Sequence, residues 1–153
     1  MYPKERMTEF VVEGISWTID VPPQNARTYS EEEDDMTEVS SETWNSTPFG
    51  NGPNIISIDL PTHRFSQEFQ TIIICKDISL KELFQKIYGF YQSPIDKNQV
   101  MNYQEDCLGF VATAKANINN GIPTLWIDLM GDNVYFEGFE NISPNSWRMC
   151  LGS

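Results

Sequence analysis

The sequence predicts an α+β fold: a mainly antiparallel sheet with one or two helices packed on one face, plus a disordered acidic insert. Three observations predict it. Short segments with alternating apolar residues occur near both ends of the chain, a strongly amphipathic helix lies between them, and a carboxylate-rich segment interrupts the first half. The 153 residues suit one domain, 1–153, because a chain of about this length buries enough surface for one core.

Charge and composition exclude several classes of protein. Ten Lys and Arg against 22 Asp and Glu give a net charge of −12, which repels phosphate backbones and argues against direct nucleic-acid binding. No apolar run reaches the about 20 residues of a membrane span, and the first residues, MYPKERMTEF, lack the apolar stretch of a signal peptide. Three widely spaced cysteines favour free thiols and a cytoplasmic location over a disulfide framework.

Residues 8–21, TEFVVEGISWTIDV, predict two short strands around Gly14. In the second strand Ile15, Trp17 and Ile19 alternate with polar residues, which is the period of a half-buried strand. Two consecutive prolines then end the strand, because proline supplies no ladder donor.

The character of the chain changes over residues 28–53. This segment contains seven Asp and Glu and no Lys or Arg, and small polar residues, Gly and Pro supply much of the rest. Such a composition buries too little apolar surface to offset the entropy lost on ordering. We therefore expect a flexible, solvated insert within the domain, with Trp44 and Phe49 docking its C-terminal end.

Two strands and a capped helix are predicted next. Residues 54–61 place alternate apolar side chains on one face, and the three successive isoleucines of 70–75 predict a buried strand. Ser79 and Glu82 fit a capping box, and apolar residues then recur at helical spacing as far as Tyr91.

The C-terminal half is predicted in less detail. A second short helix is expected to follow, with Pro94 at its first position. Residues 107–120 fit either a helix or a strand. The alternating residues of 124–130 predict a strand that forms a hairpin with a returning strand at 134–140, and 147–151 predicts a last strand.

One hypothesis for activity uses the only histidine. His63 follows Asp59 by four residues, and a histidine oriented by a carboxylate can act as a general base in a small hydrolase or transferase. Cys107, which the pattern leaves least buried, is a candidate nucleophile. No nucleophile motif or zinc-ligand spacing accompanies these residues, so a surface histidine and structural thiols are the alternative interpretation.

A second hypothesis for activity uses carboxylates. Asp128, Asp132 and Glu137 cluster about the predicted C-terminal hairpin, and paired carboxylates can share a proton or hold a metal ion such as Mg²⁺. Turns also select Asp for backbone reasons alone. The sequence contains neither a P-loop nor a dinucleotide-binding motif, and we expect no cofactor.

The lack of a catalytic set favours a non-enzymatic accessory protein that works through protein contacts. Glu31, Glu32 and Glu33 begin an acidic run that would attract a basic partner through long-range, salt-sensitive forces, although such a run can also serve only solubility. The oligomeric state is left open. Candidate contact residues are Trp44 and Phe49 on the insert, and whichever of Trp126, Met130 and Tyr135 lies on the outward face of the predicted hairpin.

Three short patterns occur in the second half of the chain, from Ile74 to Ser153. The capped helix ends in an aromatic FY-x-x-P, a GD turn follows, and a strand comes after the turn; the residues are Phe90, Tyr91, Pro94, Gly131, Asp132, Tyr135, Phe136, Glu137 and Gly138. This half of the chain resembles small uncharacterised proteins encoded by large nucleocytoplasmic DNA viruses, which share the same helix end and turn and a strand that reads FFEG. The resemblance implies a viral context, in the host cytoplasm or the virion, and no mechanism, because the family has no assigned activity.

Overall fold

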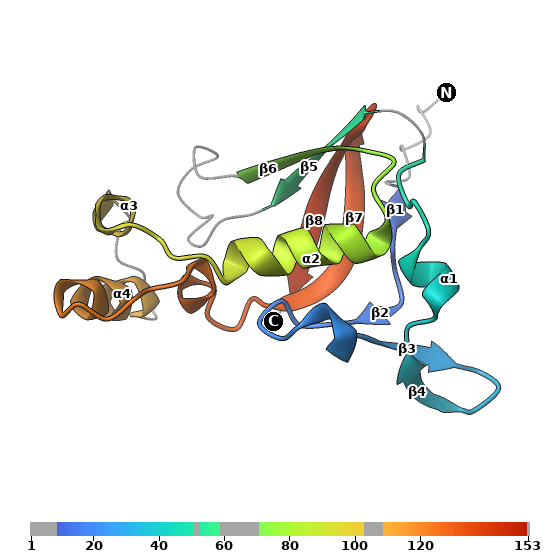
Figure 1. Cartoon of the computed structure of the whole chain (residues 1–153), viewed down its shortest axis with the longest axis horizontal. Coiled ribbons are helices and arrows are strands. Elements are labelled where there is room, and N and C mark those ends of the chain that lie inside the picture. The colour runs from blue at the N-terminus through green and yellow to red at the C-terminus, as the bar shows by residue number, and fades with distance from the viewer. Residues whose placement is uncertain (1–8, 51–52, 59–70, 103–108, 153) are drawn as a thin grey trace, which may run out of the picture.

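The computed structural model of the chain describes residues 9–50, 53–58, 71–102 and 109–152 (Figure 1). The fold is α+β, as the sequence predicts, with two mostly antiparallel sheets and a long helix across one face of the larger sheet. In chain order the elements are β1 (Phe10–Val11), β2 (Ile15–Ser16), the 3-10 helix η1 (Pro23–Asn25), β3 (Arg27–Ser30), β4 (Asp35–Glu38), α1 (Ser41–Trp44), β5 (Pro53–Ile58), β6 (Thr71–Lys76), α2 (Leu80–Tyr91), α3 (Lys97–Asn102), α4 (Phe110–Asn119), the 3-10 helix η3 (Trp126–Leu129), β7 (Tyr135–Ser143) and β8 (Ser146–Gly152).

The larger sheet has five strands in the order β1-β7-β8-β5-β6. β5 and β6 pair antiparallel along their whole length, and β8 pairs antiparallel with β7 but parallel with β5. The last strand of the chain therefore lies in the middle of the sheet. Over the described residues, the strands predicted at 54–61, 70–75 and 147–151 are confirmed as β5, β6 and β8.

α2 begins at the predicted cap and packs its apolar side on the sheet (Figure 1). Ser79 Oγ accepts a hydrogen bond from the Glu82 backbone N–H at 3.2 Å, and Trp17 stacks on Phe84 with ring centroids 4.5 Å apart. Burial of each large apolar side chain contributes about 1.5–3 kcal/mol, so this layer supplies much of the driving force for folding. The fully buried residues of α2 and the facing strands include Leu83, Phe84, Ile87, Tyr91, Ile56, Ile58, Phe139 and Met149.

A β-bulge in β7 turns two phenylalanines to the same face of the sheet. Phe136 lies opposite Leu151 and Phe139 lies opposite Met149, so two residues of β7 face one residue of β8 between these pairs. Without the bulge, Phe136 and Phe139 would point to opposite faces, yet both are buried. Gly138 has φ +99°, and a Cβ there would lie 3.0 Å from a backbone carbonyl of β1, so the bulge requires glycine.

The two short strands predicted around Gly14 are confirmed as β1 and β2. β1 pairs with β7 in the larger sheet, and β2 pairs with β3 in the smaller one. The chain then bridges back to β7 at Thr18, so this segment links the two sheets. Trp17 and Ile19 are buried, as the alternation predicts.

Residues 28–53 contain regular structure that the sequence prediction of a disordered insert did not include. β3 and β4 form a hairpin beside β2, and α1 follows, capped by Ser40, whose Oγ accepts a backbone N–H of the first turn at 3.2 Å. Trp44 and Phe49 pack against the core and supply apolar burial that the average composition of the segment conceals. The carboxylates themselves are solvated, as predicted, and they are concentrated in residues 31–35.

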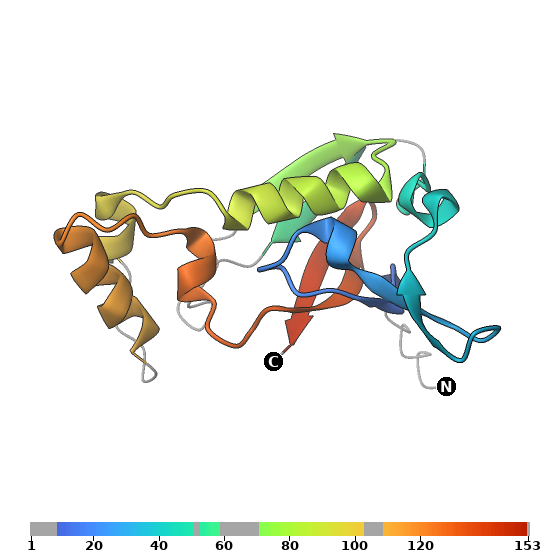
Figure 2. The same cartoon turned by 60° about the horizontal axis from the view of Figure 1, so that its bottom comes forward.

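A small helical lobe lies at one end of the molecule, beyond the C-terminal end of α2 (Figures 1 and 2). Two segments, which pair antiparallel at Pro94 and Leu125, connect the lobe to the body. The Ile95 backbone N–H donates to the Thr124 carbonyl at 2.9 Å, and the Trp126 N–H donates to the Ser93 carbonyl at 3.2 Å. This pairing holds α3 and α4 at a distance from the sheet.

The helices of the lobe refine the sequence predictions. The second helix exists as α3, but it begins three residues after Pro94. Asp96 and Gln99 set the start, because Asp96 Oδ1 accepts the Gln99 backbone N–H at 2.8 Å and the Gln99 side chain accepts the Asp96 N–H at 3.1 Å. Within the ambiguous segment 107–120, α4 is a helix.

The predicted strand at 124–130 is wrong. This segment contains η3, where Asp128 Oδ2 accepts the Leu125 backbone N–H at 2.8 Å and so stabilises a helical turn. The predicted hairpin of 124–130 with 134–140 is wrong for the same reason. The strand at 134–140 is confirmed as β7, but its antiparallel neighbours are β8, reached by a turn at 144–145, and β1.

Candidate functional site

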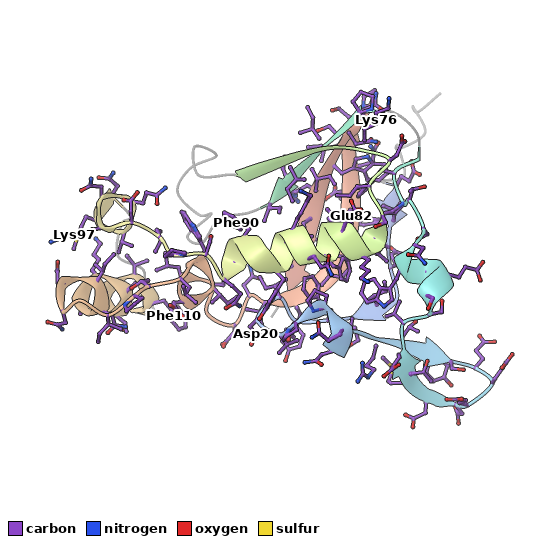
Figure 3. The ribbon with its side chains drawn as sticks, viewed as in Figure 1. Asp20, Lys76, Glu82, Phe90, Lys97 and Phe110 are labelled. Atoms are coloured by element: carbon purple, nitrogen blue, oxygen red, sulfur yellow. The ribbon has the colours of Figure 1, made fainter. Side chains whose placement is uncertain are left out.

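The hairpin of β3 and β4 ends in five consecutive carboxylates, residues 31–35, which we call the acidic tip. All five residues are exposed. The hairpin projects from the body at the end opposite the helical lobe (Figures 1 and 2), and Figure 3 shows its side chains extending outward from the two strands. The acidic tip therefore forms a compact negative field at one extremity of the molecule.

Local hydrogen bonds give the acidic tip a defined shape. Ser30 and Asp35 face each other at the end of the ladder, and Ser30 Oγ accepts the Glu33 backbone N–H at 3.4 Å. Asp34 has φ +49°, a left-handed conformation that Asp tolerates better than most residues. The Tyr29 hydroxyl donates to the Asp34 side chain, which connects the tip to β3.

The two faces of the hairpin differ in character. Tyr29 lies directly opposite Met36 in the ladder, and these side chains are 54% and 44% exposed. The neighbouring pair, Thr28 and Thr37, is half-buried, and Thr28 Oγ1 donates to the Gly14 carbonyl at 3.3 Å. The hairpin therefore turns its threonines toward the body and an aromatic–methionine pair toward solvent.

The hydrogen bond at the tip changes the acidity of Tyr29. Its phenol donates to the Asp34 carboxylate, which raises the pKa of Tyr29 above the ordinary value, and partial removal from water raises it further. Both effects favour the neutral phenol. Tyr29 thus stays a donor over the whole physiological pH range.

Trp44 and Phe49, proposed from the sequence as contact residues, are half-buried against the core. The Trp44 ring packs edge-on against Phe84 with centroids 5.3 Å apart. The Phe49 ring lies 5.3 Å from Phe139 and 5.1 Å from Trp147, by centroids. These contacts confirm that the two aromatics dock the end of the 28–53 segment.

The three C-terminal contact candidates do not share a face. Trp126 is buried and stacks on Phe90 with centroids 5.5 Å apart, and Met130 is also buried. Tyr135 is the outward residue, with 54% exposure. The predicted hairpin that would bring these residues together does not form, because η3 lies where its first strand was expected.

The carboxylates suggested as metal ligands are separated by their structural roles. Asp128 caps η3, Asp132 lies in the exposed turn that follows, and Glu137 is exposed in the bulge of β7. Among the described residues, no group of three His, Cys, Asp or Glu is arranged to hold a metal ion. The structure therefore offers no geometry for the metal hypothesis in the parts of the chain that it describes.

The histidine hypothesis falls on residues that lie outside the described ranges. His63, Asp59 and Cys107 all belong to those segments. The described thiol is Cys150, half-buried on β8, with Sγ 3.9 Å from Glu140 Oε2. Glu140 also forms an ion pair with Arg148 at 3.2 Å, so this carboxylate already serves a structural contact.

Sequence reasoning missed Tyr29 and Met36. Each stands between two polar residues, Thr28 and Ser30 or Asp35 and Thr37, which is a short alternation typical of a strand. That signal was available, but the high charge of the surrounding segment favoured a loop without strands.

Comparisons of this chain with known protein families, with curated proteins and with solved structures find no match. No helix in the described ranges combines the length and the apolar character that a bilayer crossing demands.

Proposed function

We propose that this chain is a non-enzymatic interaction protein that captures a basic segment of a partner protein on the β3–β4 hairpin. The observation that carries the proposal is the position of the exposed acidic tip beside the exposed Tyr29 and Met36 side chains. A field of one sign at the end of a projecting element accelerates encounter with an oppositely charged partner. Docking then requires contacts that charge alone does not supply.

Tyr29 and Met36 supply those contacts. Aromatic residues and methionine are enriched at protein interfaces, where they form an apolar centre and charged groups form the rim. Here the cross-strand pair is the centre and the carboxylates are the rim. The hydrogen bond from Tyr29 to Asp34 holds the ring in place before a partner arrives, which reduces the entropy lost on binding.

The hairpin also has an edge that an extended segment can use. β4 is the outer strand of the smaller sheet, in the order β2-β3-β4. An extended peptide can add to such an edge by main-chain hydrogen bonds, with alternate side chains meeting each face. A segment with alternating basic and apolar residues would place its apolar groups beside Met36 on one face and its cations beside Asp35 on the other.

The proposal is tested with a fluorescein-labelled peptide of alternating Lys and Val, by anisotropy at low and at high salt. The variant Glu31→Gln/Glu32→Gln/Glu33→Gln should bind about tenfold more weakly at low salt, because exposed ion pairs contribute about 0.2–1 kcal/mol each. The matched control Glu9→Gln/Glu13→Gln/Asp20→Asn removes three exposed carboxylates from the body and should lose far less. Equal losses in both variants would show that only net charge matters and would contradict a hairpin site.

The apolar contact has its own control. Tyr29 and Tyr135 are equally exposed, at 54%, but Tyr135 lies on β7. Tyr29→Ala should weaken binding of the same peptide severalfold, whereas Tyr135→Ala should leave it unchanged. A compartment follows from the same proposal: three widely spaced cysteines and a basic protein partner suit the cytoplasm, and the viral resemblance would place that partner in an infected cell or a virus particle.

A further inference from the structure

A cleft of about 290 Å³ opens where η1, α1 and the first turns of α2 meet. Its walls are held by the fold. The Leu80 backbone N–H at the start of α2 donates to the Ser46 carbonyl just after α1 at 2.9 Å, and Trp44 of α1 packs against Phe84 of α2. Figure 3 shows Glu82 at this end of α2, close to α1. The lining residues are Pro23, Gln24, Ser41, Trp44, Asn45, Lys81 and Gln85.

The lining of this cleft differs in charge from the chain as a whole. The chain carries 22 Asp and Glu, yet among the described residues that line the cleft there is no carboxylate, and the one charged group is the Lys81 ammonium. Gln24, Asn45 and Gln85 contribute primary amides, and Ser41 contributes a hydroxyl. Within the described part of the chain, Lys81 forms no ion pair.

The other polar side chains of the lining are similarly available. Across the ranges that the structure describes, no side-chain hydrogen bond engages the amides of Gln24, Asn45 and Gln85, the Ser41 hydroxyl or the Trp44 indole N–H. Trp44 is half-buried and Pro23 is buried, so they give the cleft an apolar side. Ammonium, amides and an apolar side thus meet in one concavity.

We propose that this cleft binds a carboxylate joined through an amide to an apolar group, the chemistry shared by a free N-acyl amino acid and by the C-terminal residue of a peptide. Lys81 pairs with the carboxylate. The side-chain amides both donate and accept, which matches an amide of the ligand. The apolar group packs on Trp44 and Pro23. The volume lies near the lower end of ligand pockets, about 300–1,000 Å³, and suits a ligand of this size.

The probes are hippurate (N-benzoylglycine) and its neutral amide, hippuramide, titrated into the full chain and followed by two-dimensional ¹H–¹⁵N NMR. Hippurate should bind saturably and shift the Trp44 indole N–H and the backbone signals of α1 and of the first turns of α2. Hippuramide has the same shape without the charge. Its affinity should be lower than that of hippurate by at least about tenfold, because charge-assisted hydrogen bonds are about twice as strong as neutral ones. The signals of residues 31–35 should not move.

The chain offers a matched pair of lysines for the variants. Lys81 and Lys86 are both exposed residues of α2, but only Lys81 lines the cleft. Lys81→Gln should weaken hippurate binding about tenfold, and Lys86→Gln should change it by less than about twofold. Unfolding midpoints of both variants should match the parent, because the side chains are exposed and make no ion pair to a described residue.

A second arm distinguishes the two sources of the ligand. The tetrapeptide Ala-Ala-Ala-Phe is compared with its C-terminal amide. Tighter binding of the free-acid peptide than of hippurate supports the C-terminus of a peptide, and binding of hippurate alone supports a free N-acyl amino acid. The proposal is overturned if neither acid saturates the site, if the acids and their amides bind equally, or if Lys81→Gln and Lys86→Gln behave alike. None of these outcomes depends on the acidic tip, so the two proposals fail separately.

Discussion

The Tyr29 hydroxyl donates a hydrogen bond to the Asp34 carboxylate across the tip of the β3–β4 hairpin. Asp34 occupies the left-handed turn position, and Tyr29 lies in the cross-strand pair with Met36. One contact therefore joins the acidic tip to the apolar face of the hairpin. The proposed docking surface is a single unit for this reason, and the bond gives it a pH dependence.

The first prediction concerns that pH dependence. Because the hydrogen bond to Asp34 raises the pKa of Tyr29, the contact is fully present below the ordinary tyrosine pKa of about 10 and is lost as pH rises through the raised value. Asp34→Asn removes the charge but keeps a residue suited to the left-handed turn, and should bring the pKa of Tyr29 down toward its ordinary value. Ring-carbon NMR of Tyr29 measures the titration. Asp35→Asn is the control, since Asp35 bonds a backbone N–H instead, and an equal fall in both variants would refute a specific bond.

The second prediction concerns a buried polar contact between β5 and β8. Asn54 Oδ1 accepts the Trp147 indole N–H at 3.2 Å, and the two residues are 3% and 8% exposed. Asn54→Ala should lower the free energy of unfolding by about 1–3 kcal/mol, because a buried donor loses its partner. Combining it with Trp147→Phe should cost about 1 kcal/mol less than the sum of the single changes. Urea unfolding measures all three variants, and strict additivity would mean that the two side chains are not coupled.

The third prediction compares two glycines with positive φ. Gly131 has φ +60°, and a Cβ there would lie 2.5 Å from a ring carbon of Phe110, the α4 residue labelled in Figure 3. Gly121 has φ +76° and open space around it. Gly121→Ala should cost about 1–2 kcal/mol for the left-handed conformation alone, and Gly131→Ala should cost about 1–3 kcal/mol more, because the ring must move.

Thermal unfolding provides the measurement for this pair. Phe110→Leu removes the two nearest crowding atoms, Cε2 and Cζ, so adding it to Gly131→Ala should recover part of the loss. If both alanine variants lost the same stability, the contact between α4 and the turn after η3 would not exist in solution.

The fourth prediction tests the start of α2. Ser79→Ala removes the side-chain acceptor for the Glu82 backbone N–H and should destabilise the protein by about 0.5–2 kcal/mol. Ser79→Asp retains an acceptor and adds a favourable charge at the helix N-terminus, so it should stay close to the parent. Chemical unfolding with an unchanged denaturant slope is the measurement, and a loss as large for Asp as for Ala would show that packing at this position, rather than capping, holds the helix.

Features with short-range causes were predictable from the chain alone. The cap at Ser79 and the apolar spacing that follows it define α2, and successive isoleucines define β6. Neighbouring residues along the chain suffice to create these signals. The solvation of residues 31–35 was predictable for the same reason, since consecutive carboxylates cannot be buried together.

The errors came from features whose cause lies far away in the chain. The alternation at 124–130 fits a strand, but β8 already occupies the position beside β7, and Asp128 stabilises a helical turn instead. The order within 28–53 was underestimated because the charge of the segment favoured a loop and because Trp44 and Phe49 find their apolar contacts on α2, β7 and β8. Composition averaged over the segment cannot report such contacts.

The sequence by itself determined the fold class, the amphipathic helix α2, most of the strands of the larger sheet and the exposure of the acidic tip. Tertiary structure alone decided that Tyr29 and Met36 share an outward face, and that η1, α1 and α2 meet at a cleft lined by Lys81. The physical reason is the separation along the chain over which each kind of interaction acts. Helical periodicity and capping act within a few residues. Strand pairing and cavities depend instead on which segments, distant in the sequence, pack against each other in the core.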